Sequence, residues 1–498
     1  MQNNKIKKVV IAGGGTAGWM AAAAFSKLFG NSLSVTIVES DLIPTVGVGE
    51  ATIPTLHIFH DLLKINEAEF MAATNATFKL GISFENWRDV SQDYLHSFGY
   101  IGQGCWAAGF QHFWLKGKQQ GIAKDIGDYC AEHLACREGK FAVLANQDRN
   151  YAYHTDAGLY AKFLRKLSKQ HGAERIEGMI DKVNVNQQNG FIDSLTLADG
   201  TVIEGDLFID CTGFKGLLIE QALHTGYENW NHILPCDSAI AVQTKQTKAL
   251  VPYTRSIAHD SGWQWQIPLQ NRMGNGLVFC SKYMTDEQAK TLLLANVEGE
   301  LINEPRVIKY QTGTRRKHWH KNCVAVGLAS GFIEPLESTS IHLIQQSIVR
   351  LMQNLPTKTM DAGVVDNFNQ KMRTEINNIR DFIVLHYHVT ERTDSEFWRY
   401  CKNMEVPSSL QQRIDLFTQS GQVYKNDLEL FGEASWLQVM IGQGLMPQSY
   451  HPIVDNMPDD QLAKFLDSIE TGIKRKVDNL PNHVDFINHY CRASNSLV

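Results

Sequence analysis

Three glycines near the N-terminus stand at a spacing that binds phosphate groups. Gly13, Gly15 and Gly18 form the pattern G-x-G-x-x-G. Glycines at these positions allow a sharp turn and a close backbone approach to a pyrophosphate, and the start of the following helix supplies amide donors. Glu39 lies about 20 residues further on, where a ribose hydroxyl needs a carboxylate acceptor. The stretch therefore predicts a dinucleotide-binding site.

A second candidate anion site lies at the start of a predicted helix. Residues 338–340 are of types that cap helices, and apolar residues repeat at helical spacing from Ile341 to Leu351. The free amides in the first turn of such a helix bind anions, such as a halide or the charge on a reduced flavin ring. An ordinary capped helix explains the same residues. Glu337, just before the cap, is either a capping acid or a general base.

Lys79 lies in a stretch that alternates like a strand. Phe78, Leu80, Ile82 and Phe84 share one predicted face, and Lys79 lies on the other. On spacing alone, this pattern favours a solvated lysine over a catalytic one.

Strands and a helix surround the first glycines as a dinucleotide site requires. Residues 9–12 and 35–39 are short apolar runs typical of buried parallel strands, and residues 19–29 predict a helix between them. The apolar run in residues 206–213 predicts a strand that returns to the same sheet. The sequence thus predicts an α/β (α+β) fold with a two-part, Rossmann-like domain whose second lobe is inserted.

Other segments carry weaker predictions. Residues 45–55 contain two further glycines and predict either a surface turn or close backbone contact with a cofactor. Residues 151–172 predict a helix, and the basic trio 315–317 predicts a solvated edge. Residues 350–498 are expected to be mostly helical.

Composition excludes several classes of protein. The 498 residues include 47 Lys and Arg against 53 Asp and Glu, for a formal charge of −6. This balance argues against nucleic acid or an anionic membrane as partner. No apolar run approaches the roughly 18 residues that span a bilayer, so we expect a cytoplasmic protein. Nine cysteines without any C-x-x-C pair predict reduced thiols and no metal site.

Taken together, the motifs show that the chain resembles the flavin-dependent tryptophan halogenase family over essentially its full length. The resemblance rests on Gly13–Gly18, the loop Val46–Pro54, Lys79, Trp263–Pro268 and Pro335–Ser340. The W-x-W-x-I-P pattern of the fourth segment, together with the lysine, separates these enzymes from flavin hydroxylases that share the glycine motif.

The resemblance implies a fold and an activity. The fold is an FAD-binding, flavin-monooxygenase-like box, which we assign to residues 1–350, with a mostly helical pyramid at 351–498. The activity is halogenation of an electron-rich aromatic such as indole or tryptophan, using FADH2, O2 and chloride or bromide. A flavin hydroperoxide oxidises the halide to hypohalous acid, which Lys79 positions by hydrogen bonding or as a haloamine. A separate NAD(P)H-dependent flavin reductase supplies FADH2 transiently, and a homodimer is compatible with the family.

Catalytic and halide-binding roles also follow from the resemblance. Lys79 corresponds to the catalytic lysine and Glu337 to the acid across the substrate, which stabilises the cationic intermediate and takes its proton. The backbone amides of Thr339 and Ser340 correspond to the halide site.

The substrate site implied by the resemblance is an aromatic sandwich. His96 and Phe98 would form one side and Trp436 the other. Tryptophan-specific members hold the amino acid with a tyrosine pair and a glutamate, whereas here Tyr424 is followed by Lys425 and no clear counterpart of the glutamate precedes Trp436. Indole or another electron-rich aromatic is therefore at least as good a candidate as tryptophan. The implied FAD contacts are Gly13, Gly15, Thr16, Ala17, Gly18, Glu39, Ala51, Val183, Leu328 and Ile341.

Two alternatives compete with halogenation. An FAD-dependent aromatic monooxygenase shares the glycine motif but has no use for Lys79. A non-catalytic FAD-binding protein would bind flavin without forming a halogenated product. The chain has no second G-x-G-x-x-G with the right flanks, so we expect that NAD(P)H alone does not reduce its flavin.

Overall fold

The computed structural model describes residues 4–43, 49–144 and 148–493. The loop 45–55, for which the sequence left two interpretations, therefore lies partly outside the described residues. Within the described ranges, no helix combines the length and the apolar character needed to cross a bilayer.

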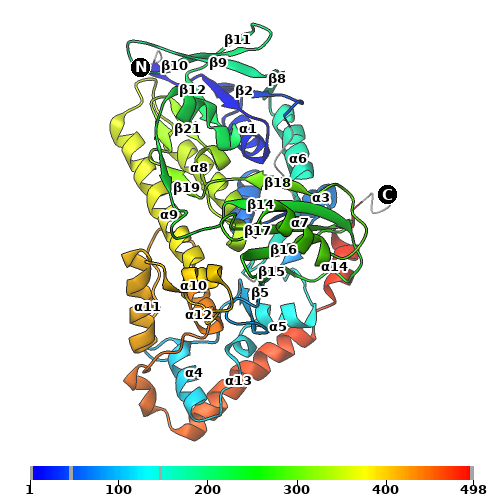
Figure 1. Cartoon of the computed structure of the whole chain (residues 1–498), viewed down its shortest axis with the longest axis vertical. Coiled ribbons are helices and arrows are strands. Elements are labelled where there is room, and N and C mark those ends of the chain that lie inside the picture. The colour runs from blue at the N-terminus through cyan, green and yellow to red at the C-terminus, as the bar shows by residue number, and fades with distance from the viewer. Residues whose placement is uncertain (1–3, 44–48, 145–147, 494–498) are drawn as a thin grey trace.

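A six-stranded sheet carries the N-terminal glycine motif (Figure 1). Its order is β20-β21-β12-β1-β2-β8, and all neighbours except β20 and β21 run parallel. Helix α1 (Thr16–Phe29) follows β1 directly, and its four consecutive alanines are fully buried. The predicted strand–helix–strand unit and the returning strand, β12, are both confirmed. The strands are β1 (Lys8–Ala12), β2 (Ser34–Glu39), β8 (Glu174–Glu177), β12 (Leu207–Asp210), β20 (Trp319–His320) and β21 (Cys323–Ala325).

A seven-stranded sheet lies below the first sheet in the view of Figure 1. Its order is β18-β14-β17-β16-β15-β5-β6, and only the β15–β5 pair is parallel. Strand β16 contains the W-x-W-x-I-P motif. The strands are β5 (Gly81–Glu85), β6 (Asp93–Ser97), β14 (Ser238–Lys245), β15 (Tyr253–His259), β16 (Gly262–Pro268), β17 (Arg272–Phe279) and β18 (Arg306–Lys309).

Three small sheets complete the strands, in the orders β3-β7-β4, β11-β10-β9 and β13-β19-β22. The helix predicted for 151–172 is wrong in its first part, because β7 is hydrogen-bonded between β3 and β4 and only the residues after it form helix α6 (Ala157–Gln170). The strands are β3 (Gly49–Ala51), β4 (Thr77–Lys79), β7 (Ala152–Asp156), β9 (Ile180–Val185), β10 (Ile192–Leu197), β11 (Val202–Glu204), β13 (Tyr227–Asn229), β19 (Gly313–Arg315) and β22 (Gly331–Phe332).

The alternating stretch around Lys79 is divided between two sheets. Strand β4 ends at Lys79 and β5 begins at Gly81, so Phe78 packs in one hydrophobic core and Phe84 in the other. Lys79 itself is fully buried. The prediction of a solvated lysine is therefore wrong, because protein covers both faces of the chain where it crosses between the sheets.

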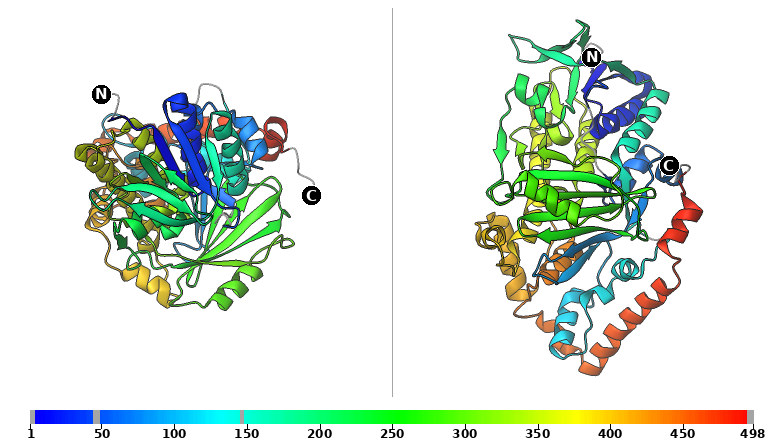
Figure 2. Two further views of the ribbon diagram at one scale, coloured as in Figure 1. Left: turned by 90° about the horizontal axis from the view of Figure 1, so that it is seen from above. Right: turned by 45° about the vertical axis from the view of Figure 1, so that its right-hand side comes forward.

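The chain after residue 350 is mostly helical, as predicted. The long helix α9 runs from the six-stranded sheet toward the narrow end of the molecule, and α13 lies along its outer edge (Figures 1 and 2). These helices are α9 (Ala362–His388), α10 (Glu396–Asn403), α11 (Ser408–Ser420), α12 (Glu433–Gly442), α13 (Asp459–Asp478) and α14 (His483–Tyr490). The earlier helices are α2 (Leu56–Leu62), α3 (Glu67–Ala73), α4 (Phe110–Gln119), α5 (Ala131–Glu138), α7 (Asp286–Ala295) and α8 (Ser340–Gln353).

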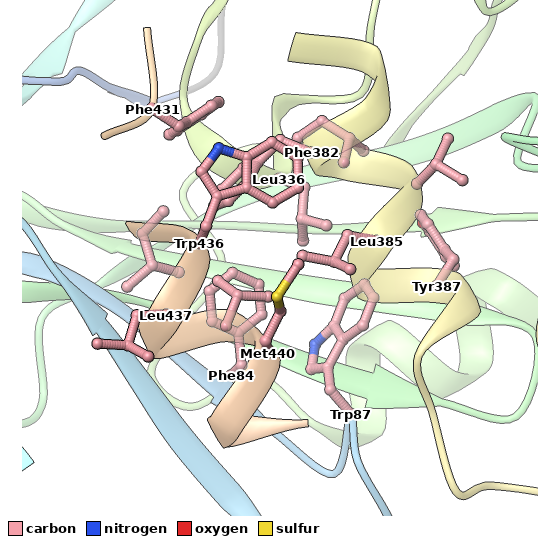
Figure 3. Packing of buried hydrophobic residues seen from close by; sticks show 14 of the residues in the cluster. Phe84, Trp87, Leu336, Phe382, Leu385, Tyr387, Phe431, Trp436, Leu437 and Met440 are labelled. Carbon is pink, nitrogen blue, oxygen red and sulfur yellow. The ribbon is translucent and has the colours of Figure 1, made fainter. Parts of the chain in front are cut away.

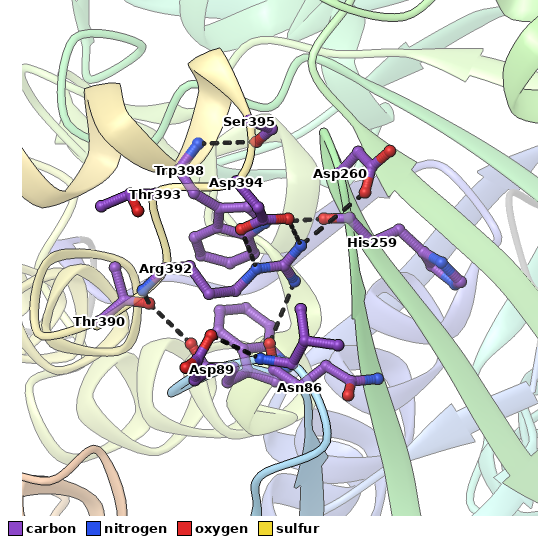
Figure 4. Close-up of polar contacts among 12 residues, drawn as sticks. Asn86, Asp89, His259, Asp260, Thr390, Arg392, Thr393, Asp394, Ser395 and Trp398 are labelled. Carbon is purple, nitrogen blue, oxygen red and sulfur yellow. Dashed lines mark hydrogen bonds and ion pairs between the residues drawn. The ribbon is translucent and has the colours of Figure 1, made fainter.

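Arg392, just after α9, connects this part of the chain to the end of strand β5 in the seven-stranded sheet (Figure 4). Its guanidinium donates to the Asn86 carbonyl at 3.1 Å and to Asp394 at 2.9 and 2.7 Å, and lies 4.8 Å from the ring of Trp398. The Trp398 indole in turn donates to the His259 carbonyl at 2.8 Å. The largest hydrophobic cluster among the described residues likewise contains residues from both sides of position 350.

Arg315 contradicts the prediction of a solvated basic edge. It is buried, lies 2.9 Å from Glu220, and donates through Nε to the Ala329 carbonyl at 3.1 Å. Arg316 and Lys317 are exposed, as predicted. The three residues differ because Arg315 ends strand β19 inside a sheet while its neighbours follow the strand.

Candidate active site

A cavity of about 980 Å³ lies beside the glycine motif. Residues 13–17 line it at one place and residues 338–340 at another, so the two anion sites predicted from the sequence share one space. Gly18, Val183 and Ile341 are not among its lining residues. The predicted cofactor contacts that do line it are Gly13, Gly15, Thr16, Ala17, Glu39, Ala51 and Leu328.

The three glycines of the motif are needed for different reasons. Gly13 has φ of +105°, and a Cβ there would lie 2.3 Å from the Cys211 carbonyl oxygen. A Cβ on Gly18 would lie 1.9 Å from the Gly13 oxygen, whereas a Cβ on Gly15 would have no atom of the described residues within 4 Å. The fold therefore requires Gly13 and Gly18, while Gly15 leaves open space for a group that enters the cavity.

Glu39 sits at the cavity wall with its carboxylate held on both sides. Arg175 donates to Oε1, Arg165 lies 3.4 Å from the same oxygen, and the Trp19 indole donates to Oε2 at 3.2 Å. A fixed carboxylate here suits a ribose hydroxyl. Together with the glycine backbone and the cavity size, these contacts fit the FAD that the sequence predicts.

Helix α8 begins within residues 338–340, which line the cavity at a different place from the glycine motif. Ser338 has a left-handed φ of +59°, and Thr339 occupies the N-cap position. The prediction that these side chains cap the helix is wrong, since no side chain caps α8 and the Ser338 hydroxyl is engaged by Lys79. Among the described residues, the N–H groups of Thr339 and Ser340 have no hydrogen-bond acceptor. The helix start thus presents free donors to the cavity.

Lys79 lies directly behind this helix start. Its Nζ donates to the Ser338 hydroxyl at 2.8 Å and to the Thr52 carbonyl at 3.1 Å, and lies 5.2 Å from the centre of the Phe98 ring. Burial lowers the pKa of Lys79 to about 7, although Glu337 acts against this shift. Ser338 lines the cavity and also contacts Lys79, so a single residue separates the two.

Glu337 forms the centre of a buried chain of polar groups. Nδ1 of His96 lies 2.9 Å from both carboxylate oxygens, and Nε2 of His386 lies 2.9 Å from Oε1. The hydroxyl of Tyr94 lies 2.7 Å from Nδ1 of His386. Burial alone would raise the pKa of Glu337, but the two histidines outweigh burial and lower the pKa to about 2. The carboxylate is thus ionised and contacts histidines, so Glu337 is not a capping acid.

Aromatic rings pack around His96, the partner of Glu337, and Figure 3 shows three of the nearby rings, those of Phe382, Phe431 and Trp436. The His96 ring centre lies 6.5 Å from Phe98, 5.6 Å from Phe382 and 6.2 Å from Phe431. The ring centre of Trp436 lies 4.9 Å from that of Phe382. Among the described residues, Trp436 makes no ring contact with His96 or Phe98. Sequence reasoning missed His386, Phe382 and Phe431 because each is distant in sequence from Glu337 and belongs to no motif.

Comparison with known proteins decides the family. The model of the tryptophan halogenase family matches residues 8–459. This chain belongs to the tryptophan halogenase family. Among solved structures similar to it, Xcc4156, a flavin-dependent halogenase from Xanthomonas campestris, has a TM-score of 0.97 and 54% identity, over 98% of this chain and 99% of that one. BrvH, a flavin-dependent halogenase from Brevundimonas sp. BAL3, has a TM-score of 0.93 and 43% identity, over 97% and 99% of the two chains.

Curated relatives agree with the solved structures. Tryptophan 6-halogenase ThaL from Streptomyces albogriseolus is 33% identical over 535 residues, which cover 99% of this chain and 100% of that protein. The predicted resemblance and the FAD-binding α/β fold are confirmed. The halogenase is a flavin-dependent enzyme that uses reduced FAD, O2 and a halide to halogenate an aromatic substrate.

Proposed function

We propose that this halogenase acts on a neutral, electron-rich aromatic such as indole in preference to free tryptophan, with Lys79 and Glu337 as its catalytic residues. One observation carries the proposal: the buried amine of Lys79 contacts Ser338, which lines the cavity, while the buried carboxylate of Glu337 is the preceding residue of the same turn. An oxidant made in the cavity thus has one short route to an amine and a carboxylate.

Lys79 receives the oxidant in this proposal. A pKa near 7 leaves a large fraction of the amine neutral at physiological pH. The lone pair of a neutral amine attacks the halogen of hypohalous acid, which breaks the oxygen–halogen bond, forms a haloamine and releases water. The ammonium form instead donates a hydrogen bond to hypohalous acid. Ser338 and the Thr52 carbonyl fix the direction of Nζ in either form.

Glu337 acts on the substrate. Its ionised carboxylate stabilises the positive charge that develops on the aromatic ring and accepts the ring proton. Because His386 is in turn linked to Tyr94, the geometry also offers a path for that proton away from the carboxylate.

The cavity supplies the other components. FAD bound here in its reduced form would supply two electrons to O2, and the resulting peroxide-level oxygen would oxidise the halide to hypohalous acid. The glycine motif and Glu39 hold its dinucleotide part, and the amides of Thr339 and Ser340 hold the halide. Trp263 and Trp265 also line the cavity, where they fill space that an aromatic substrate would need to reach the flavin.

Charges beside Trp436 support the preference for a neutral substrate. The guanidinium of Arg413 lies 3.9 Å from the Tyr424 ring and 4.4 Å from the Trp436 ring, and it forms a buried ion pair with Glu429. Phe431 stacks on Phe382 at 3.8 Å. The charges of Arg413 and Glu429 thus neutralise each other, and apolar rings occupy the space near His96, which does not favour an ammonium and a carboxylate.

The test compares kcat/KM for bromination of indole and of tryptophan, with FAD, bromide, NADH and a separate flavin reductase. We expect indole to be preferred, and a clearly higher value for tryptophan contradicts the proposal. Phe431→Glu is the matched variant, because a carboxylate there should shift the ratio toward tryptophan.

The cellular setting follows from the same proposal. A separate NAD(P)H-dependent reductase supplies reduced FAD transiently to a cytoplasmic halogenase. Rapid bleaching of bound FAD by NADH without a reductase contradicts this arrangement.

A further inference from the structure

Glu334 is a second buried acid in the turn that carries Glu337. Its side chain is fully buried, and Oε2 accepts hydrogen bonds from the Trp263 indole at 3.1 Å and from the Tyr387 hydroxyl at 2.5 Å. Among the described residues Oε1 has no partner. Burial raises the pKa of Glu334 to about 7. A carboxyl group that is costly to bury and only half satisfied is an unusual choice for packing alone.

Neighbouring residues of α9 hold the two acids of this turn. His386 approaches Glu337, and Tyr387 donates to Glu334. Glu334 additionally contacts Trp263 in the central part of the seven-stranded sheet. One carboxylate therefore joins three elements: the catalytic turn, the helix that approaches Glu337, and the cavity wall.

Ring contacts connect Trp263 in the cavity wall to His386 of the Glu337 site. It lines the cavity, and its ring centre lies 6.3 Å from Trp87, whose ring is 6.1 Å from His386 and 5.2 Å from Tyr387. Figure 3 shows Trp87 and Tyr387 with Leu336 of the turn in one packed cluster. Within the part of the chain that the structure describes, the Trp263 indole N–H donates to Glu334 alone, and this bond fixes the orientation of that ring in the wall.

We propose that Glu334 is a positioning residue that keeps the oxidant inside the protein, by holding Trp263 and the turn 335–338 closed around the route from the cavity to Lys79. This rests on the proposed function, in which Lys79 receives the oxidant. Loss of the anchor frees the indole to rotate, and the opened wall admits water and releases hypohalous acid. Glu334 touches neither substrate nor oxidant in this role.

The test measures a partition ratio, which does not depend on how much enzyme is folded. The first quantity is the brominated indole formed per reduced FAD consumed. The second is the hypobromous acid that escapes from the enzyme, which is trapped by a β-diketone scavenger, monochlorodimedone, in the presence of catalase. We expect Glu334→Ala to raise the escaped fraction relative to product about fivefold, the effect of losing one ordinary hydrogen bond. Glu334→Gln retains an oxygen that accepts from both donors and should restore most of the ratio.

Further variants keep the test decisive if Glu334→Ala does not fold. Trp263→Phe removes the indole donor and should raise the escaped fraction. Glu334→Leu, which removes the acceptor and fills the space, should have little further effect in that background, because Glu334 acts through Trp263. Glu67 is the matched control: it accepts hydrogen bonds from Tyr151 and Tyr490, both at 2.8 Å, and does not line the cavity. Glu67→Gln should leave the partition ratio unchanged.

The outcomes separate this inference from the proposed function. An unchanged ratio in Glu334→Ala, or in Trp263→Phe if the former does not fold, overturns the role of Glu334 while wild-type bromination stands. A Glu334→Gln ratio as poor as that of Glu334→Ala overturns the hydrogen-bond mechanism. Wild-type enzyme that brominates no aromatic at all overturns the proposed function itself.

Discussion

The cavity and the Lys79–Glu337 site differ in whether their polar groups are free or already have partners within the protein. The cavity is roomy, and its key groups are backbone amides and glycines left free to meet a large cofactor. The Lys79–Glu337 site has fully buried side chains, and the amine of Lys79 and the carboxylate of Glu337 are already hydrogen-bonded within the protein. Ser338 is the residue that contacts both.

In the proposed mechanism, this difference lets one chain make a reactive oxidant and still use it selectively. An open cavity admits the cofactor, the halide and O2. A closed, polar pocket strengthens electrostatic interactions and excludes water, so it controls where the oxidant reacts. Separate variants should therefore remove one function and leave the other.

The largest effect should come from Lys79. Lys79→Met fills the same space with an uncharged chain and should lower bromination of indole by more than about a thousandfold, the scale of losing a reacting nucleophile. Oxidation of reduced FAD should continue near the wild-type rate, because the cavity is unchanged. The measurement is brominated product beside flavin reoxidation in the same reaction. Retained bromination would refute the role of this lysine.

Glu337→Gln should slow bromination by about a hundredfold, as expected for the loss of one general base. The amide keeps the size of the side chain but cannot take the ring proton. Single-turnover product formation gives the rate, and FAD affinity serves as the control. A rate within about threefold of wild type would remove Glu337 from the mechanism.

The pH profile sharpens the role of Lys79. The pKa of Lys79 is lowered to about 7, so the neutral amine dominates above that pH, whereas Glu337, with a pKa of about 2, stays ionised throughout. If the neutral amine takes up halogen, single-turnover bromination should rise about tenfold from pH 6 to pH 8. A rate that falls over this range instead indicates that the ammonium acts by hydrogen bonding.

The smallest effects should come from the glycine motif. Gly18→Ala places Cβ 1.9 Å from the Gly13 oxygen, so it should lower the free energy of unfolding without FAD by about 1–3 kcal/mol. A Cβ on Gly15 has none of the described residues within 4 Å, so Gly15→Ala should leave that stability unchanged while weakening FAD binding. Thermal unfolding and FAD titration of both variants test this, and equal stability losses would contradict it.

Local patterns predicted much of the cavity. The strand, glycine and helix sequence at residues 9–29 and the acid at Glu39 are contiguous, so short-range spacing is enough to identify them. The helix that starts near residue 340 was equally visible. The absence of side-chain capping could not be predicted in the same way, because Ser338 accepts a hydrogen bond from Lys79, a residue 259 positions away.

The sequence alone was enough to predict the family, the dinucleotide site and the helical C-terminal part, since each rests on local periodicity or on short contiguous motifs. Tertiary structure decided the environment of the proposed catalytic side chains. Lys79 looks solvated in its own strand and becomes buried because the chain there crosses between two covered sheets. Glu337 acquires His96 and His386 only when β6, the turn and α9 meet, and no local pattern encodes burial or charge created by such distant partners.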